Sequence, residues 1–180
     1  MVLEDTAQVV SLKEVKEFVL PASSGALIKC GNELIMYQRD NKPNIPHPGK
    51  LAIFGGRIDS VEEIPIIALT REIGEELNIE ISEEQVRYLG TLAAGDDQDH
   101  IKHISLVEIT PEQKSLIVKG PEGKELKFFT PDNLPDTDEL VPDLKVFFVD
   151  HKDKLISWLN GEDITASDLG LKKNEAVEVA

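Results

Sequence analysis

Thirteen residues, PIIALTREIGEEL from Pro65 to Leu77, constrain the fold of this chain more than any other stretch. Their large apolar residues recur at spacings of three and four, which is the period of one face of an α-helix. Pro65 suits the first turn of a helix, because the amide hydrogen that proline lacks would have no partner there. The stretch therefore predicts an amphipathic helix whose apolar stripe packs on a core; the stripe consists of Ile66, Leu69, Ile73 and Leu77.

The segments around this helix read mainly as strands, with a turn at Gly31-Asn32 and a proline-rich loop at NKPNIPHPGK. Strands, a central helix, more strands and a closing helix predict a layered domain of the α+β or α/β class. The expected strands cover about 25–30, 33–38, 51–54, 86–92, 101–109, 115–118 and 125–129, and the closing helix about 140–159.

The length of 180 residues predicts one domain over 17–159, with an N-terminal arm over 1–16 and a loosely ordered acidic tail over 160–180. Thirty-four acids against 19 bases argue against binding to nucleic acid, which relies on Lys and Arg to neutralise phosphates. No apolar run approaches the ~20 residues of a membrane span. The single cysteine, Cys30, excludes an internal disulfide and is expected on a half-buried strand. We expect a cytoplasmic protein.

Glutamates gather on one flank of the predicted helix. With Ile73 at the centre of the apolar stripe, Glu76 lies about 60°, Glu72 about 100° and Glu75 about 160° to the same side. Neighbouring carboxylates repel one another, and Gly74 adds roughly 1 kcal/mol relative to alanine. A solvated acidic face is one reading of such a run. The other is a site for a divalent cation, since Mg²⁺, Mn²⁺ and Ca²⁺ prefer clustered hard oxygens.

The stretch beginning at Gly55-Gly56 resembles the Nudix box, whose pattern is G-x5-E-x7-R-E-U-x-E-E-x-G-U with U a bulky aliphatic residue. The loop after Gly56 is one residue longer than the pattern, so either Glu62 or Glu63 takes the place of the first glutamate. Asn78 stands where the pattern has its late glycine, and asparagine tolerates the left-handed backbone that ends a helix. The residues in register are Arg71, Glu72, Ile73, Glu75, Glu76 and Ile79.

The resemblance spans roughly residues 20–158 and implies a Nudix α/β/α sandwich with a mixed central sheet. It also implies a hydrolase that cleaves a nucleoside diphosphate linked to another group, of the nucleoside triphosphate or nucleotide sugar type. Mg²⁺ is the implied cofactor, with Mn²⁺ as a substitute, and a homodimer is compatible with this class. The implied metal ligands are the carboxylates of Glu72, Glu75 and Glu76 and the carbonyl of Gly56, with Arg71 orienting Glu72.

The implied catalytic set is completed by a general base on a later loop, for which we favour Glu122 over Glu125 from its position before Phe128-Phe129. Arg39 is a candidate to bind a substrate phosphate, the alternative being a surface ion pair with Asp40. Arg57 is the second candidate for this role.

Two further readings remain open. The segment GDDQDHIKH offers a metal site or, as we prefer, an acidic loop; its candidate ligands are Asp96, Asp97, Asp99, His100 and His103. A non-catalytic Nudix module that senses a nucleotide is the alternative function, although Glu72, Glu75 and Glu76 are all present. An EF-hand-like calcium protein would need a ligand spacing that the sequence lacks.

Overall fold

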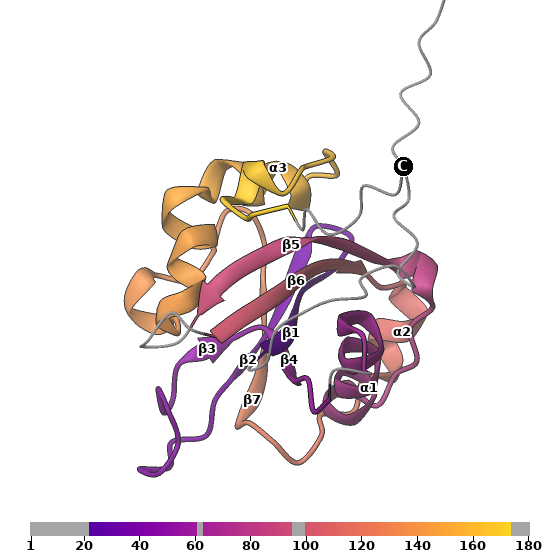
Figure 1. Ribbon diagram of the computed structural model, residues 1–180, viewed down its shortest axis with the longest axis vertical. Coiled ribbons are helices and arrows are strands. Elements are labelled where there is room, and N and C mark those ends of the chain that lie inside the picture. Colours follow the sequence, from indigo (N-terminus) through magenta and orange to yellow (C-terminus); the bar gives the residue numbers. More distant parts are fainter. Residues whose placement is uncertain (1–21, 61–62, 95–99, 174–180) are drawn as a thin grey trace, which may run out of the picture.

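The computed structural model describes residues 22–60, 63–94 and 100–173. Within these ranges the strands are β1 (Ala22–Cys30), β2 (Glu33–Gln38), β3 (Leu51–Ala52), β4 (Phe54–Arg57), β5 (Val86–Ala94), β6 (His100–Glu108) and β7 (Glu125–Phe129), and the helices are α1 (Pro65–Leu77), α2 (Pro111–Leu116) and α3 (Lys152–Leu159). Helices lie on both sides of the sheet (Figure 1), so the expected α/β/α sandwich is confirmed. The expected arm over 1–16 lies outside the described residues.

The strands in these ranges form one mixed sheet. Hydrogen-bonded neighbours follow the order β3-β2-β1-β6-β5, while β4 pairs with β1 and β7 pairs with β2. β1 runs parallel to β6, and the other pairs of strands in this sheet are antiparallel. No helix in the described part of the chain is long and apolar enough to cross a membrane.

Helix α1 has the predicted bounds and covers one face of the sheet. Its stripe of Ile66, Leu69, Ile73 and Leu77 is buried against residues of β1, β2 and β6. Burial of such side chains stabilises by about 1.5–3 kcal/mol each, which is what holds the glutamate-bearing flank in place. The helix ends at Asn78, whose φ of 54° is left-handed and whose amide donates to the carbonyl of Gly74 at 3.0 Å.

The opposite face of the sheet is covered by the chain from residue 140 onward. The expectation of one helix over 140–159 is wrong, because Pro142–Leu144 forms a 3₁₀ turn, Val146–Asp150 a π-helical turn, and α3 begins only at Lys152. The break lies at His151, whose φ is −124° and whose amide donates to the carbonyl of Val146, five residues back, at 3.0 Å. The apolar residues still face the sheet, so the layer forms without a continuous helix.

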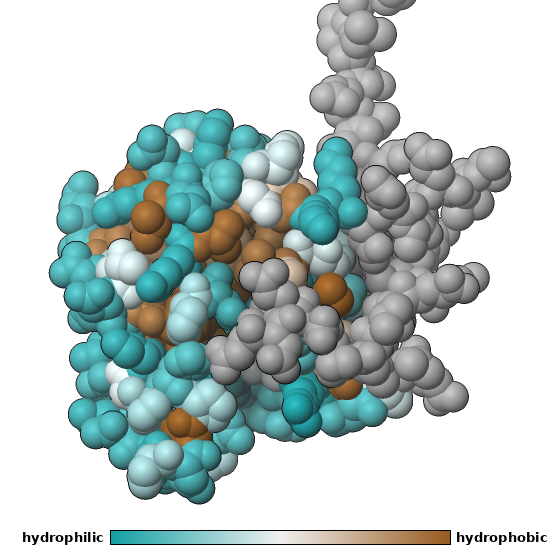
Figure 2. All heavy atoms as spheres, turned by 60° about the vertical axis from the view of Figure 1, so that its left-hand side comes forward, coloured by the Kyte–Doolittle hydropathy of each residue, from teal (hydrophilic) through white to brown (hydrophobic). Residues whose placement is uncertain are grey.

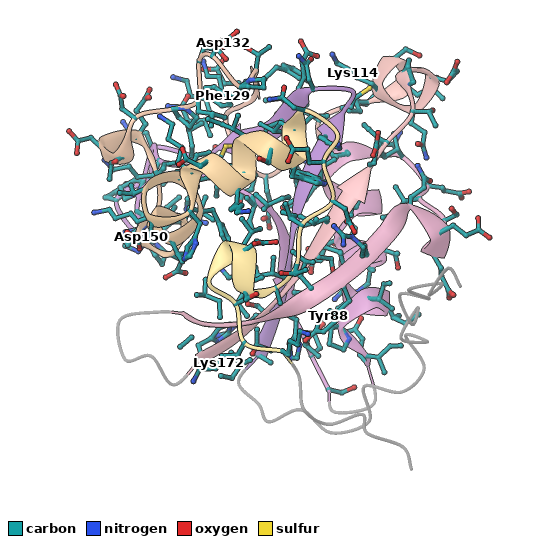
Figure 3. The ribbon with its side chains drawn as sticks, turned by 90° about the horizontal axis from the view of Figure 1, so that it is seen from above. Tyr88, Lys114, Phe129, Asp132, Asp150 and Lys172 are labelled. Carbon is teal, nitrogen blue, oxygen red and sulfur yellow. The ribbon has the colours of Figure 1, made fainter. Side chains whose placement is uncertain are left out.

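The segment after Asn160 is packed, and the expectation of a loosely ordered tail is wrong as far as Lys173. Ile164, Leu169 and Leu171 are at most 5% exposed and belong to the core beneath α3. Lys172 exchanges two backbone hydrogen bonds with Thr91 of β5, at 2.8 and 3.0 Å, and it lies beside that strand in Figure 3. Residues 174–180 lie outside the described part of the chain.

A strand was also expected over 115–118, where the chain instead ends helix α2. Thr110 caps this helix, because its hydroxyl accepts from the amide of Gln113 at 3.1 Å while the Gln113 side chain accepts from the amide of Thr110 at 2.9 Å. Pro111 occupies the first helical position. This reciprocal pair and the proline favour a helix start over a strand.

A buried lysine joins α3 to the sheet. The ammonium of Lys29 donates to the carbonyl of Trp158 at 2.8 Å and lies 4.9 Å from the centroid of the Trp158 ring, with the Glu108 carboxylate at 3.7 Å. Trp158 is in the last turn of α3, where the helix dipole favours a cation. The neighbouring Cys30 is buried and free.

Candidate active site

Two glycines in the middle of β4 let that strand lie directly against β1 and α1. Gly55 has a φ of 136°, which side chains rarely adopt, and a Cβ there would lie 2.0 Å from the carbonyl oxygen of Ser24. A Cβ on Gly56 would lie 2.3 Å from Oε1 of Glu72. The amide of Gly55 donates to Oε2 of Glu76 at 3.1 Å. The strand is therefore in contact with two of the glutamates on the flank of α1.

Arg71 connects the loop after β4 to helix α1 through hydrogen bonds. Its Nε donates to Oε1 of Glu63 at 3.1 Å, its Nη1 to Oε1 of Glu72 at 2.9 Å, and its Nη2 to the carbonyl of Arg57 at 3.4 Å. The hydrogen bond to Arg71 lowers the pKa of Glu63, and the same bond raises the pKa of Arg71. Of the two candidates for the first box glutamate, Glu63 contacts Arg71, while Glu62 lies outside the described residues.

The carboxylates of α1 lie in an environment that opposes their ionisation. Burial raises the pKa of Glu76 to about 8, and the charges of Glu72, Glu122 and Glu75 add to the shift, while the amide of Gly55 counteracts it. Burial also raises the pKa of Glu72, against the hydrogen bond from Arg71. The Glu75 side chain is 62% exposed, and its Oε1 lies 3.7 Å from Nη1 of Arg71.

No group of three or more His, Cys, Asp and Glu side chains in the described ranges is already arranged to hold a metal ion. The donor chemistry of the flank nevertheless fits one. Glu72, Glu75 and Glu76 present hard carboxylate oxygens from positions i, i+3 and i+4 of one helix, and such oxygens are the ligands that Mg²⁺ and Mn²⁺ prefer. Burial and mutual repulsion disfavour the ionised forms of Glu72 and Glu76, and a bound cation would reverse that effect.

Glu122, the candidate base, is brought to the same flank by the loop between α2 and β7. Its charge contributes to the raised pKa of Glu72, Glu76 and Tyr37, so its carboxylate lies within electrostatic reach of all three. Glu125 is placed differently, because its carboxylate pairs with Lys127 at 2.9 Å, and this hydrogen bond lowers its pKa. Glu122, and not Glu125, therefore contributes to the electrostatic environment of the acids of α1.

A cavity of about 440 Å³ lies beside the glycines of β4. Figure 2 shows that one side of the molecule is mainly hydrophilic, with apolar residues grouped near its centre. In a chain of formal charge −15, a concentration of basic side chains around one cavity favours an anionic ligand. The basic residues that line it are Arg39, His47, Arg57, His100 and Lys102, and the acid in the lining, Asp143, pairs with Lys102 at 3.3 Å.

Both arginine candidates line this cavity. Nε of Arg39 donates to the carbonyl of Pro46 at 2.9 Å. Burial raises the pKa of the Tyr37 hydroxyl to about 12, and the charge of Arg39 counteracts this shift. The expected alternative, an ion pair between Arg39 and Asp40, does not form; Asp40 pairs with Lys42 at 3.0 Å. Arg57 is exposed.

The two candidate histidines of GDDQDHIKH point to opposite faces of the sheet, as alternation along β6 requires. Nε2 of His100 lies 2.8 Å from the hydroxyl of Ser23 in the cavity. His103 is buried with Nδ1 3.0 Å from the Tyr88 hydroxyl, and burial lowers its pKa to about 4. Asp96, Asp97 and Asp99 lie outside the described residues.

The sequence interpretation missed Lys102 and His47 as cavity residues. The signal for Lys102 was available, because it follows His100 by two residues and therefore shares its face of the strand. Nothing in the sequence around His47 indicates that it lines the cavity, because only the tertiary fold brings its loop there.

The family model for the NUDIX domain matches residues 20–150. Among solved structures, the MutT protein of Methanosarcina mazei Go1 is 18% identical with a TM-score of 0.59, over 74% of this chain and 92% of its own. A MutT/nudix family protein from Enterococcus faecalis is 17% identical with a TM-score of 0.57, over 87% of this chain and 73% of its own. No curated protein matches the chain significantly. Since the family model covers well over half of the sequence, the chain belongs to the NUDIX family of hydrolases.

Proposed function

We propose that this protein is a divalent-metal-dependent pyrophosphohydrolase that cleaves a nucleoside diphosphate linked to another group, by attack of water on phosphorus. The observation that carries the proposal is the position of Gly55-Gly56. The carboxylates of Glu72 and Glu76 contact these glycines, and the basic cavity lies beside them. A phosphate chain crossing the glycines would therefore meet both an acidic cation site and a set of basic side chains.

The cofactor would be held by the carboxylates of Glu72, Glu75 and Glu76, with the carbonyl of Gly56 as a further ligand. Mg²⁺ is the proposed ion and Mn²⁺ its substitute; either would neutralise the charge on the phosphates and favour attack at phosphorus. Arg71 orients Glu72 through the 2.9 Å hydrogen bond. It also restrains the loop before α1, which keeps the glycines against the helix.

The remaining roles fall to residues on either side of the glycines. The carboxylate of Glu122 accepts the proton of the attacking water, because its loop presents it to the acids of α1. Arg39 and Arg57 bind the substrate phosphates, for which a guanidinium offers paired donors. The proposed substrate is a nucleoside triphosphate or a nucleotide sugar.

The proposal is tested with the full chain and a panel of nucleoside triphosphates, nucleotide sugars, ADP-ribose and dinucleotides in Mg²⁺. Released phosphate is measured with and without added phosphatase, which separates orthophosphate from phosphomonoester products. We expect phosphomonoester or pyrophosphate release that stops in EDTA. Equal rates in EDTA and Mg²⁺ would contradict the metal requirement. Binding of a nucleotide without turnover of any substrate would overturn the proposal in favour of a sensing module.

A further inference from the structure

The loop that carries Glu122 is folded around a single ammonium group. Nζ of Lys119 donates to the carbonyls of Gly120 at 2.5 Å, Glu122 at 3.2 Å and Gly123 at 2.8 Å. An ammonium has three hydrogens, so these three acceptors account for all of them. One of the acceptors is the backbone carbonyl of Glu122 itself, and this fixes the peptide to which the Glu122 side chain is attached.

The same loop is docked on the last turn of α1. The amide of Val118 donates to the carbonyl of Leu77 at 3.1 Å, and the amide of Gly120 donates to the carbonyl of Glu76 at 2.7 Å. These are two of the terminal helix carbonyls that have no partner within the helix. A Cβ on Gly120 would lie 2.3 Å from the carbonyl oxygen of Glu75, so the approach is as close as the backbone allows.

The far end of the loop is tied to the sheet, where the amide of Lys124 donates to the carbonyl of Gln38 at 2.8 Å. Between these two attachments the chain makes a tight turn, and the ammonium of Lys119 occupies the inside of that turn. Without it, three carbonyls that now converge would repel one another and turn outward to water.

We infer that Lys119 is a positioning residue, which holds the turn in the shape that presents the Glu122 carboxylate to α1. This inference rests on the proposed function, in which Glu122 accepts the proton of the attacking water. Lys119 does not itself touch the substrate. Its removal should therefore lower kcat and leave KM unchanged, because a base displaced by about 1 Å can lose as much as ~10²-fold in rate.

The test compares three variants for kcat and KM. Lys119→Met keeps the aliphatic stem and removes the donors, and we expect kcat to fall at least ~10-fold with KM within about 2-fold of wild type. Lys119→Arg keeps the charge, but its planar donors diverge and cannot serve three converging carbonyls, so it should resemble the Met variant. Lys124→Met removes the same charge from the exposed part of the same loop and is the matched control, expected to equal wild type.

Two further measurements separate positioning from other roles. In a Glu122→Gln background, Lys119→Met should cause no additional loss, because it acts through Glu122. In the metal-free protein, the amide hydrogens of Val118 and Gly120 should exchange faster in Lys119→Met than in wild type, independently of any activity.

Wild-type kinetics in Lys119→Arg, additive losses in the double variant, or unchanged amide exchange would each overturn the inference. A rise in KM without a fall in kcat would likewise show that Lys119 contacts the substrate. Failure of the proposed function is distinguishable, since it would appear as an inactive wild type, while the exchange rates would still report on the loop.

Discussion

Carboxyl groups at this site lie in surroundings that oppose their ionisation, and Glu76 is the most affected of them. Its pKa is raised to about 8 by burial. The folded protein therefore binds a proton that the unfolded chain releases above about pH 4.5. Glu76 therefore does not affect stability below about pH 4.5, destabilises the metal-free protein increasingly between about pH 4.5 and 8, and has a constant effect above that range.

Replacing Glu76 by Gln should consequently separate stability from activity. In EDTA at pH 8.5 the variant should unfold at a higher temperature than wild type, and at pH 4.5 the two should be alike. In Mg²⁺ the same variant should lose at least ~10²-fold in turnover, because a ligand carboxylate is gone. Thermal unfolding at both pH values and initial rates check this. A variant less stable than wild type at pH 8.5 would contradict the assigned environment of Glu76.

Glu122 and Glu125 provide a matched pair on one segment. Glu122→Gln should lower kcat by ~10²–10⁴-fold with little change in KM, as expected for loss of a general base. Glu125→Gln should leave both constants near wild type, because that carboxylate is engaged with Lys127. Steady-state kinetics of the two variants decide the assignment. If Glu122→Gln is fully active while Glu63→Gln is inactive, the base belongs to the loop before α1.

At the scale of elements, α1 was predictable to the residue because its apolar period, its proline and its asparagine all agree. Helix α2 was mistaken for a strand, although Thr110 and Gln113 carried a capping signal at the right spacing. The sequence carries no such signal for the interruptions that divide the expected helix over 140–159 before α3 begins. Val146–Asp150 is apolar enough to continue a helix, yet it forms a π-helical turn that ends at His151, with Phe147 and Phe148 buried in the core.

Gly74 offers a test of how far α1 is shaped by local preference. It lies mid-helix, and a Cβ there would have Ile79 O at 4.0 Å as its nearest neighbour, which is ordinary contact. Gly74→Ala should therefore raise the free energy of unfolding by roughly 0.5–1 kcal/mol, through the lower backbone entropy of the unfolded chain. Denaturant titration measures this, and turnover should be retained. Destabilisation would show that the helix needs the glycine for a reason other than space.

At the scale of the whole molecule, the sequence predicted both layers and the box but not the boundary of the folded unit. The box residues are recognisable because spacing along one helix brings them together. The basic cavity is assembled from β2, β4, β6 and the loop before β3, which only the sheet topology unites. The segment after Asn160 has no helical or strand period, so its burial against α3 depends on tertiary contacts alone.

A chain ending at Asn160 should be markedly less stable than one ending at Lys173. Ile164, Leu169 and Leu171 would lose their burial, worth about 1.5–3 kcal/mol each, and the outer edge of β5 would lose its partner. We expect a loss on the order of 5 kcal/mol in the free energy of unfolding, measured by denaturant titration. The chain ending at Lys173 is the control and should match the full chain. Equal denaturation midpoints for the chains ending at Asn160 and at Lys173 would show that the segment between them does not contribute to the stability of the core.

The contact between Lys29 and Trp158 gives the protein an optical reporter of its own. Trp158 is the single tryptophan of the chain, it is 5% exposed, and it lies in the last turn of α3 with an ammonium 4.9 Å from the centroid of its ring. Its emission will therefore follow the docking of α3 on the sheet. The glutamates of α1 lie on the other side of that sheet, so the same signal is insensitive to events at the candidate active site. Unfolding can be watched by fluorescence, whereas ligand binding will need a different probe.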